Sequence, residues 1–150
     1  MTTIAYKDGV MAADSGSWFS GACAPWAMKL SQGPDGTLYG AAGNAAQCEA
    51  FHKWVRTGCH GEAPKPDITG DLESSFIVLA AEVDGPIRLI TAHGAESYYY
   101  APYFAIGAGA AVAMGAMFAG GDAETAVRAV LTHGDGAAGA VRTLRHPAGE

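Results

Sequence analysis

The sequence contains little that would hold the chain together covalently or tie it to a membrane. It has three cysteines, Cys23, Cys48 and Cys59, and no CxxC pair. Because the odd number leaves at least one thiol unpaired, reduced thiols in the cytoplasm are favoured over a disulfide framework. The N-terminus has no apolar signal-peptide core, and glycines interrupt the apolar stretch 104–121. Neither segment is expected to cross a membrane.

Basic residues are also scarce. The chain has 9 Lys and Arg against 15 Asp and Glu, a net charge of −6 at pH 7, and the basic residues form no cluster. This balance argues against a nucleic-acid partner. At 150 residues, the chain is predicted to form a single domain, 1–150, that buries roughly 68–70% of its unfolded surface.

Cofactor and metal motifs are lacking, and no cofactor is predicted. Cys48 and His52 are four residues apart on a predicted helix, with Cys59 and His60 nearby, so a metal site is one possible interpretation. Cys48, however, lies on the apolar stripe of that helix, and single buried cysteines mostly act as small hydrophobic residues. The metal site is therefore disfavoured.

Three Asp-Gly turns are present, each between apolar segments. They are Asp8-Gly9, Gly33-Pro34-Asp35-Gly36 and Asp84-Gly85. Asp-Gly favours the backbone conformation of two-residue hairpin turns, so each turn predicts a pair of antiparallel strands. The stretch 76–81 is apolar almost throughout, as expected of a strand covered on both faces. The sequence therefore predicts antiparallel sheets covered by helices.

Helix signals follow the strands in two places. The first helix is predicted over 44–57, with Asn44 as its N-cap. Two further helices are predicted over 109–118 and from the N-cap Asp122 to Gly134. A last strand is predicted at 139–144. The segment 58–74 is rich in proline, glycine and acid, and is predicted to be a loop. The helix 109–118 is apolar on every side, which suggests a subunit contact. The order predicts an α+β fold with two antiparallel sheets between helix layers.

The N-terminus carries a candidate nucleophile. If Met1 is removed, Thr2 has both a hydroxyl and a free α-amine, and an α-amine with a pKa of roughly 7.7–8.0 is suited to act as a general base. The first hairpin would bring Asp14 beside Thr2. The alternative is that Thr2 and Thr3 are only β-branched residues opening a strand.

Four motifs together resemble one known family. They are Thr2-Thr3-Ile4, Val10-Met11-Ala12-Ala13-Asp14-Ser15, Met28-Lys29-Leu30 and Ala41-Ala42-Gly43-Asn44-Ala45-Ala46. The set resembles the proteasome β-subunit and its bacterial relative, the HslV-type peptidase, which are N-terminal nucleophile (Ntn) hydrolases. Ile106-Gly107-Ala108-Gly109 and Asp135-Gly136-Ala137-Ala138-Gly139 are further matches. The resemblance implies a four-layer αββα sandwich, shortened in the middle, where the loop 58–74 replaces a second long helix.

The resemblance also assigns roles to five residues. It makes Thr2 the nucleophile, Lys29 the cation that lowers the pKa of the Thr2 hydroxyl, and Asp14 the carboxylate that holds Lys29. The backbone N–H of Gly43 would bind the oxyanion, and Asp135 would belong to the outer shell of the site. A lysine kept charged by a carboxylate and a glycine before a helix N-terminus both suit this chemistry.

The sequence departs from the family at Ala108 and Ala138, where relatives usually have serines that form hydrogen bonds near the amine of the nucleophile. The resemblance also places Ala27, Ala41 and Ala45 around the substrate side chain beside the scissile bond. Since all three are small, a roomy apolar pocket for a large hydrophobic side chain is expected.

The expected function is therefore that of a threonine endopeptidase. It would hydrolyse peptides or unfolded proteins inside a homo-oligomeric ring, with an ATP-dependent unfoldase as a possible partner. Two alternatives stay open. One is an inactive ring or scaffold protein that retains Met1, and the other is an Ntn amidohydrolase that acts on a small amide.

Overall fold

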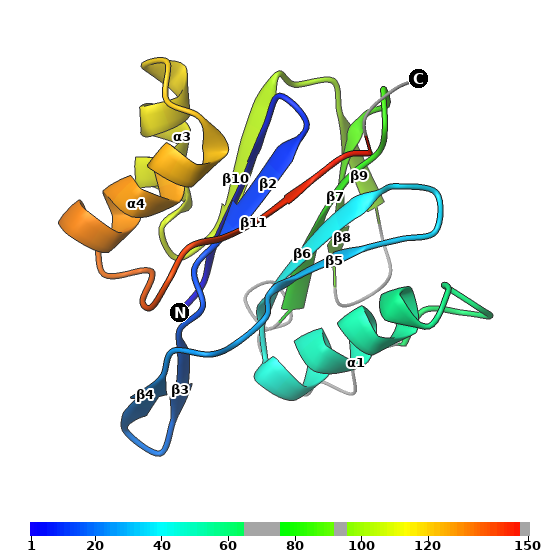
Figure 1. Cartoon of the computed structure of the whole chain (residues 1–150), viewed down its shortest axis with the longest axis horizontal. Coiled ribbons are helices and arrows are strands. Elements are labelled where there is room, and N and C mark those ends of the chain that lie inside the picture. Colours follow the sequence, from blue (N-terminus) through cyan, green and yellow to red (C-terminus); the bar gives the residue numbers. More distant parts are fainter. Residues whose placement is uncertain (65–75, 92–95, 148–150) are drawn as a thin grey trace.

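The computed structural model describes residues 1–64, 76–91 and 96–147. Over these ranges the chain forms an α+β structure with antiparallel sheets, as the sequence predicted (Figure 1). The strands are β1 (Thr3–Lys7), β2 (Val10–Ala13), β3 (Ser17–Phe19), β4 (Ala22–Ala24), β5 (Leu30–Gln32), β6 (Leu38–Gly43), β7 (Phe76–Ala81), β8 (Ile87–Thr91), β9 (Glu96–Tyr99), β10 (Tyr103–Gly107) and β11 (Arg142–Arg145). The helices are α1 (Ala45–Arg56), α3 (Ala110–Phe118) and α4 (Ala123–His133). None of the helices in these ranges has the length and apolar content needed to cross a bilayer.

The strands form two larger sheets and one small hairpin. The first sheet has the order β10-β1-β2-β11, the second has the order β5-β6-β7-β8-β9, and β3 pairs only with β4. All three predicted hairpins are confirmed by the pairs β1–β2, β5–β6 and β7–β8. At the first turn, Asp8 and Gly9 have φ values of 52° and 78°, which is the positive-φ pair that a type I′ turn requires.

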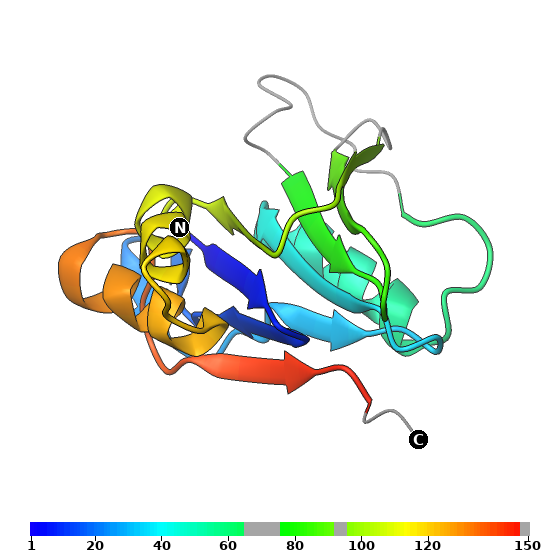
Figure 2. The same ribbon diagram turned by 90° about the horizontal axis from the view of Figure 1, so that it is seen from above.

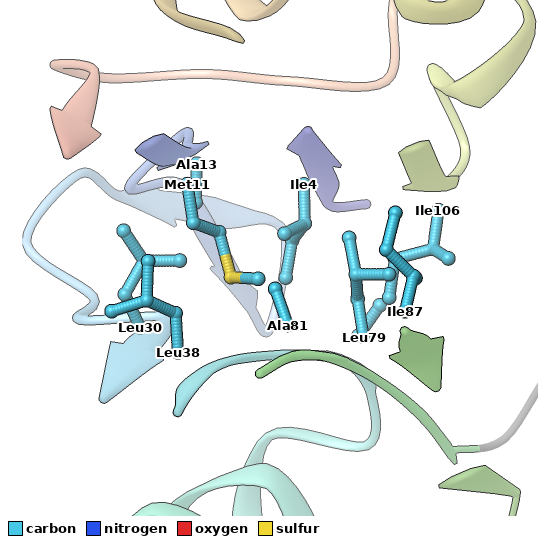
Figure 3. Close-up of a cluster of buried hydrophobic side chains, with 10 residues drawn as sticks. Ile4, Met11, Ala13, Leu30, Leu38, Leu79, Ala81, Ile87 and Ile106 are labelled. Atoms are coloured by element: carbon cyan, nitrogen blue, oxygen red, sulfur yellow. The ribbon is translucent and has the colours of Figure 1, made fainter. Parts of the chain in front are cut away.

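The main core lies between the two sheets (Figure 3). Ile4 and Met11 project from the first sheet toward Leu38 and Leu79 of the second, and all four side chains are fully buried. Gly40 lets the sheets approach, since a Cβ at this position would lie 2.5 Å from Cγ2 of Ile4. The side-chain alternation of β1 and β2 therefore directs one face of their sheet into this core.

Helices cover the outer face of each sheet (Figure 2). Helices α3 and α4 pack Met117, Val127 and Val130 against the alanines of the first sheet. On the second sheet, Phe51 and Val55 of α1 pack against β6 and β7. The molecule therefore has three apolar clusters in succession. One lies between α3, α4 and the first sheet, one between the two sheets, and one between the second sheet and α1.

Both helix caps predicted from the sequence are confirmed. Oδ1 of Asn44 accepts a hydrogen bond from the backbone N–H of Gln47 (3.1 Å), and Oδ1 of Asp122 accepts one from Thr125 (2.7 Å). Each cap satisfies a backbone N–H group that the first helical turn cannot pair internally. The start of α1, directly after β6, is thereby fixed.

The structure contains strands that the sequence did not predict. The hairpin β3–β4 was not predicted, because its turn at Ser20-Gly21, with φ values of 50° and 84°, lacks the Asp-Gly signal. Strand β10 was also missed, since the apolar stretch beginning at residue 104 reads as one segment with the helix after it. Of the predicted loop 58–74, residues 58–64 contain no helix or strand, and residues 65–74 lie outside the described residues.

The last strand begins later than predicted, at Arg142 rather than at Gly139. Residues 138–140 bind a different segment instead. The Ala138 carbonyl accepts a hydrogen bond from the backbone N–H of Ser15 (3.0 Å), and the Ala140 carbonyl accepts one from the Ser15 hydroxyl (2.7 Å). Gly139 has a φ of 76°, which is incompatible with an extended strand. Residues 138–140 therefore hold Ser15, shortly after β2, through both its backbone and its side chain.

Candidate active site

Thr2 is held in place through its backbone at the start of β1. The Thr2 carbonyl accepts a hydrogen bond from the N–H of Ala108 (2.8 Å), the residue that follows β10. Gly107, with a φ of 97°, allows this close approach, because a Cβ on Gly107 would lie 1.9 Å from the Thr2 carbonyl oxygen. The pairing of β1 with β10 thus fixes the backbone of the candidate nucleophile.

The Lys29 ammonium group contacts the Thr2 hydroxyl. Its Nζ lies 3.0 Å from Oγ1 of Thr2 and 3.1 Å from each carboxylate oxygen of Asp14. It also donates to the carbonyl of Met1 (3.2 Å). Lys29 comes directly before β5 and is 8% exposed. The structure therefore brings together Thr2, Asp14 and Lys29, the three residues that were predicted to share one site.

The Asp14 carboxylate is fully buried and bound by backbone donors as well as by Lys29. Oδ1 accepts a hydrogen bond from the N–H of Thr3 (3.0 Å), and Oδ2 accepts bonds from the N–H groups of Gly16 (3.3 Å) and Ala138 (3.0 Å). These donors give both oxygens of the buried carboxylate hydrogen-bond partners, which a buried polar group needs. Asp14 can therefore hold the Lys29 ammonium in a fixed position.

Two opposing effects act on Lys29. Burial lowers the pKa of the Lys29 ammonium below its ordinary value of 10.5, and the neighbouring Asp14 carboxylate raises it in part. The net direction is downward, because removing the ammonium from water outweighs its attraction to Asp14. Lys29 thus loses its proton more easily than a lysine on the surface does.

Gly43 ends β6 immediately before the N-cap of α1. Its φ is 122°, a conformation that residues with a side chain rarely adopt. Gly43 lines two pockets, and Thr2 lines both of them as well. The N-terminal end of a helix favours negative charge. The location of Gly43 is therefore compatible with its predicted role as the backbone donor to an oxyanion.

The first of these pockets has a volume of about 370 Å³ and the second about 520 Å³. The first pocket is lined by Ala27, Ala41 and Ala45, as predicted. It is less apolar than expected, because two polar residues of α1, Glu49 and His52, line it together with Cys48. The second pocket extends along Ala42, Ile77 and Ala108.

His52 lines this pocket, which was not predicted from the sequence. The ring is 1% exposed, and its Nδ1 lies 2.6 Å from the hydroxyl of Ser31. Burial lowers the pKa of His52 from 6.5 to about 4, with a smaller contribution from Arg56. Ser31 and His52 are 21 positions apart and belong to different elements, so no local spacing in the sequence indicates their contact.

The remaining predicted residues contribute differently. Asp135 lies exposed in the turn between α4 and β11, and no hydrogen bond or ion pair within the described residues joins it to Thr2 or Lys29. Its role in an outer shell stays a prediction. Ala108 and Ala138 lack the serine hydroxyls of the resembled family, but their backbone N–H groups bind Thr2 and Asp14, respectively. Each of these two residues therefore contributes a backbone donor in place of a side-chain hydroxyl.

The described residues contain no group of three or more His, Cys, Asp or Glu side chains suited to hold a metal ion. Burial raises the pKa of the Cys48 thiol to about 11, so this thiol is protonated near neutral pH and is a poor nucleophile. Of Thr2 and Cys48, Thr2 is therefore the stronger candidate nucleophile in the first pocket.

No protein-family model matches the chain, and a comparison with curated proteins also finds no match.

Proposed function

We propose that this protein is an N-terminal threonine peptidase of the proteasome and HslV type, active after Met1 has been removed. The observation that carries the proposal is the position of the Lys29 ammonium between the Thr2 hydroxyl and the Asp14 carboxylate, at 3.0 and 3.1 Å. A buried cation beside a hydroxyl stabilises developing negative charge on its oxygen. An ion pair with a purely structural role would need only the contact between Lys29 and Asp14, without the contact between Lys29 and the Thr2 hydroxyl.

In the proposed reaction, Oγ1 of Thr2 attacks the carbonyl carbon of a peptide bond. The free α-amine of Thr2 accepts the hydroxyl proton, directly or through water, and passes it to the leaving amine. The N–H of Gly43 stabilises the oxyanion of the tetrahedral intermediate. The C–N bond breaks, an ester forms on Thr2, and water hydrolyses the ester to release the acid and regenerate the hydroxyl.

Removal of Met1 is required for two reasons. While Met1 is present, the nitrogen of Thr2 is a non-basic amide that cannot accept the proton. Met1 also lines both pockets and takes a hydrogen bond from Lys29. Its removal would free space in both pockets beside Thr2, and these pockets would hold the substrate residues before and after the scissile bond.

The fold supports the same proposal. Helices α3 and α4, the first sheet, the second sheet and α1 follow one another through the molecule, and their contacts are apolar clusters. We assign this order to the αββα sandwich of Ntn hydrolases, in which the nucleophile begins a strand of a central sheet. Only one helix covers the second sheet within the described residues.

Assembly and partners are part of the proposal. Phe118 at the end of α3 is 82% exposed and Val112 is 39% exposed, and exposed apolar residues on one helix are typical of a protein contact. A homo-oligomeric ring would cover them and enclose the peptidase sites. In the cytoplasm, the ring would hydrolyse unfolded proteins, and an ATP-dependent unfoldase is its possible partner.

One observation favours a second candidate function. The hydrogen bond from Lys29 to the Met1 carbonyl gives the uncut N-terminus a defined partner in the site. A protein that keeps Met1 would then be an inactive ring or scaffold protein. An amidohydrolase that acts on a small amide would use the same chemistry as the peptidase on a smaller substrate.

Hydrolysis assays with matched variants test the proposal. We expect the Met1-free protein to cleave fluorogenic peptides, and Thr2→Ala and Lys29→Met to reduce kcat at least about 100-fold while both variants remain folded. Melting curves are needed because removing one partner of a buried pair costs about 3–5 kcal/mol. Unchanged turnover in folded Lys29→Met would refute the proposed role of the ammonium, and cleavage of small amides alone would favour the amidohydrolase.

A further inference from the structure

Two fully buried hydroxyl groups near the proposed site have no part in the chemistry described above. They belong to Thr3 and Ser15, and both residues are 0% exposed. The Thr3 hydroxyl donates to the carbonyl of Gly136 (2.9 Å), and the Ser15 hydroxyl donates to the carbonyl of Ala140 (2.7 Å). Strand pairing uses backbone groups alone and requires neither hydroxyl. Both hydroxyls therefore act on one segment of the chain, 136–140.

The segment 136–140 contributes a backbone donor to the proposed site. The N–H of Ala138, at the middle of the segment, donates to Oδ2 of Asp14 (3.0 Å). The Ala138 carbonyl accepts a hydrogen bond from the N–H of Ser15 (3.0 Å). The two hydroxyls thus hold the segment at its two ends, on either side of the residue that binds Asp14.

Both ends of the segment are closely packed. A Cβ on Gly109 would lie 2.3 Å from Oγ1 of Thr3, and a Cβ on Gly136 would lie 2.5 Å from the backbone nitrogen of Gly109. At the other end, a Cβ on Gly139 would lie 2.5 Å from Oγ of Ser15. Glycine at these three positions permits contacts that a side chain would block. The two hydrogen bonds therefore depend on a precise fit of the segment.

The Asp14 carboxylate connects this segment to the candidate nucleophile. Each of its oxygens lies 3.1 Å from Nζ of Lys29, and this Nζ lies 3.0 Å from Oγ1 of Thr2. The backbone donors to Oδ2 are Ala138 at 3.0 Å and Gly16 at 3.3 Å. If the segment moved, Oδ2 would keep only the longer of these two bonds. The carboxylate could then turn away from the ammonium group.

We propose that the hydroxyls of Thr3 and Ser15 are positioning groups. They hold the segment 136–140, whose central N–H keeps the buried carboxylate in contact with the ammonium group beside the nucleophile. The inference rests on the proposed function, because it concerns the same nucleophile. Neither residue lines either of the two pockets beside Thr2, so both act through other groups and without contact to the substrate.

Peptide hydrolysis by Met1-free variants is the first test. Thr3→Val keeps the branched shape and removes the hydroxyl. We expect kcat to fall about tenfold with KM unchanged, because the ammonium group is displaced while the substrate contacts remain. Ser15→Ala should act in the same direction. Thr3→Ser keeps the hydroxyl and should retain kcat within about twofold.

Thr37→Val is the matched control for the loss of a buried threonine hydroxyl. Thr37 is 1% exposed, lies in the turn between β5 and β6, and lines neither pocket. Its hydroxyl forms a hydrogen bond with Asp35 in the same turn. We expect this variant to keep the kcat of the wild type, whatever stability it loses in a melting curve.

The titration of Lys29, followed by the NMR signal of its ¹³Cε, is a second test that needs no activity. Burial lowers the pKa of Lys29, and the Asp14 carboxylate raises it in part. A carboxylate that turns away should therefore lower this pKa further, so the ammonium group should lose its proton at a lower pH in Thr3→Val and Ser15→Ala. Cys48 and Cys23 also raise the pKa of Lys29, and both are unchanged in these variants.

The two measurements distinguish this inference from the proposed function. A Lys29 titration that is identical in the wild type and in whichever of Thr3→Val and Ser15→Ala folds would overturn the inference, as would an equal loss of kcat in Thr37→Val. If the Met1-free wild type cleaves no peptide but the Lys29 titration shifts as expected, the positioning role stands and the peptidase is contradicted.

Discussion

Three residues that are far apart in the sequence meet around one ammonium group, because Lys29 contacts both the Thr2 hydroxyl and the Asp14 carboxylate. Thr2 precedes β1, Asp14 follows β2, and Lys29 precedes β5, so each is located at the end of a strand. The motifs around these residues were sufficient to predict that they share a site. Strand ends are suited to this role because the flanking strands fix their backbone while the side chains remain free to meet.

Other parts of the site were not predictable from residue type. The contact of His52 with Ser31 depends on how α1 packs over β5, and it joins residues 21 positions apart. The backbone bond from Ala138 to Asp14 spans 124 positions. Since any residue except proline supplies a backbone N–H, no side-chain pattern could indicate that Ala138 contributes one.

The pKa of His52 predicts a pH-dependent stability. The folded ring takes up a proton near pH 4 and the unfolded ring near pH 6.5, so between these values the unfolded chain binds more protons. The free energy of unfolding should therefore fall as the pH is lowered from about 6.5 to about 4, by up to about 3 kcal/mol. Urea titrations at several pH values measure this slope.

His52→Gln should remove much of that slope, whereas His133→Gln should retain it because His133 is exposed at the end of α4. Equal slopes in both variants and the wild type would show that His52 is not the group responsible.

Gly107 offers a direct test of the backbone around Thr2. We expect Gly107→Ala to destabilise the protein by more than about 2 kcal/mol, because a Cβ would lie 1.9 Å from the Thr2 carbonyl oxygen and φ is 97°. Gly115→Ala is the matched control: it lies on α3 with no atom within 4 Å of the added Cβ, and should stabilise the helix by up to about 1 kcal/mol. Thermal melts that show equal effects would contradict this account.

At the scale of elements, local turn and cap signals were informative. The three Asp-Gly turns and the caps Asn44 and Asp122 depend on interactions within four residues, and all five were predicted correctly. Strand β10 was missed because its assignment depends on pairing with β1, about a hundred residues away. Local propensity does not contain that information.

The cap of α1 is predicted to matter for activity as well as for stability. Asn44→Ala and Asp122→Ala should each cost about 0.5–2 kcal/mol, the usual loss for a helix cap. Only Asn44→Ala should also lower kcat/KM, roughly tenfold, because Asn44 directly follows Gly43 and fixes the turn into α1. Urea titration and peptide hydrolysis on both variants check this. Equal activity of the two would argue that Gly43 is positioned by other contacts.

At the scale of the whole molecule, the exposed apolar side of α3 is the feature that the internal packing does not explain. Ala113 and Met117 of this helix are buried against the first sheet, whereas Phe118 is 82% exposed. The sequence predicted a subunit contact here from the absence of a polar face. Composition alone could not identify which residues would be left uncovered, because that depends on how α3 and α4 pack together.

We therefore predict that Phe118→Glu weakens self-association. Sedimentation velocity should show a shift from an assembly toward the monomer, since a charge replaces an apolar side chain in the contact. Ser97→Glu adds the same charge on the exposed strand β9 and should leave the assembly intact. A wild-type protein that remains monomeric at high concentration would contradict the predicted contact.

The central claim is that Thr2, freed of Met1 and held beside Lys29, is a reactive nucleophile. The most direct measurement is mass spectrometry of the N-terminal peptide after the native protein is treated with a hydroxyl-directed β-lactone. The account predicts that the peptide begins at Thr2 and carries one acyl group on its hydroxyl, and that folded Lys29→Met carries almost none. A folded wild-type protein that retains Met1 throughout, or that begins at Thr2 yet remains unmodified, would contradict it.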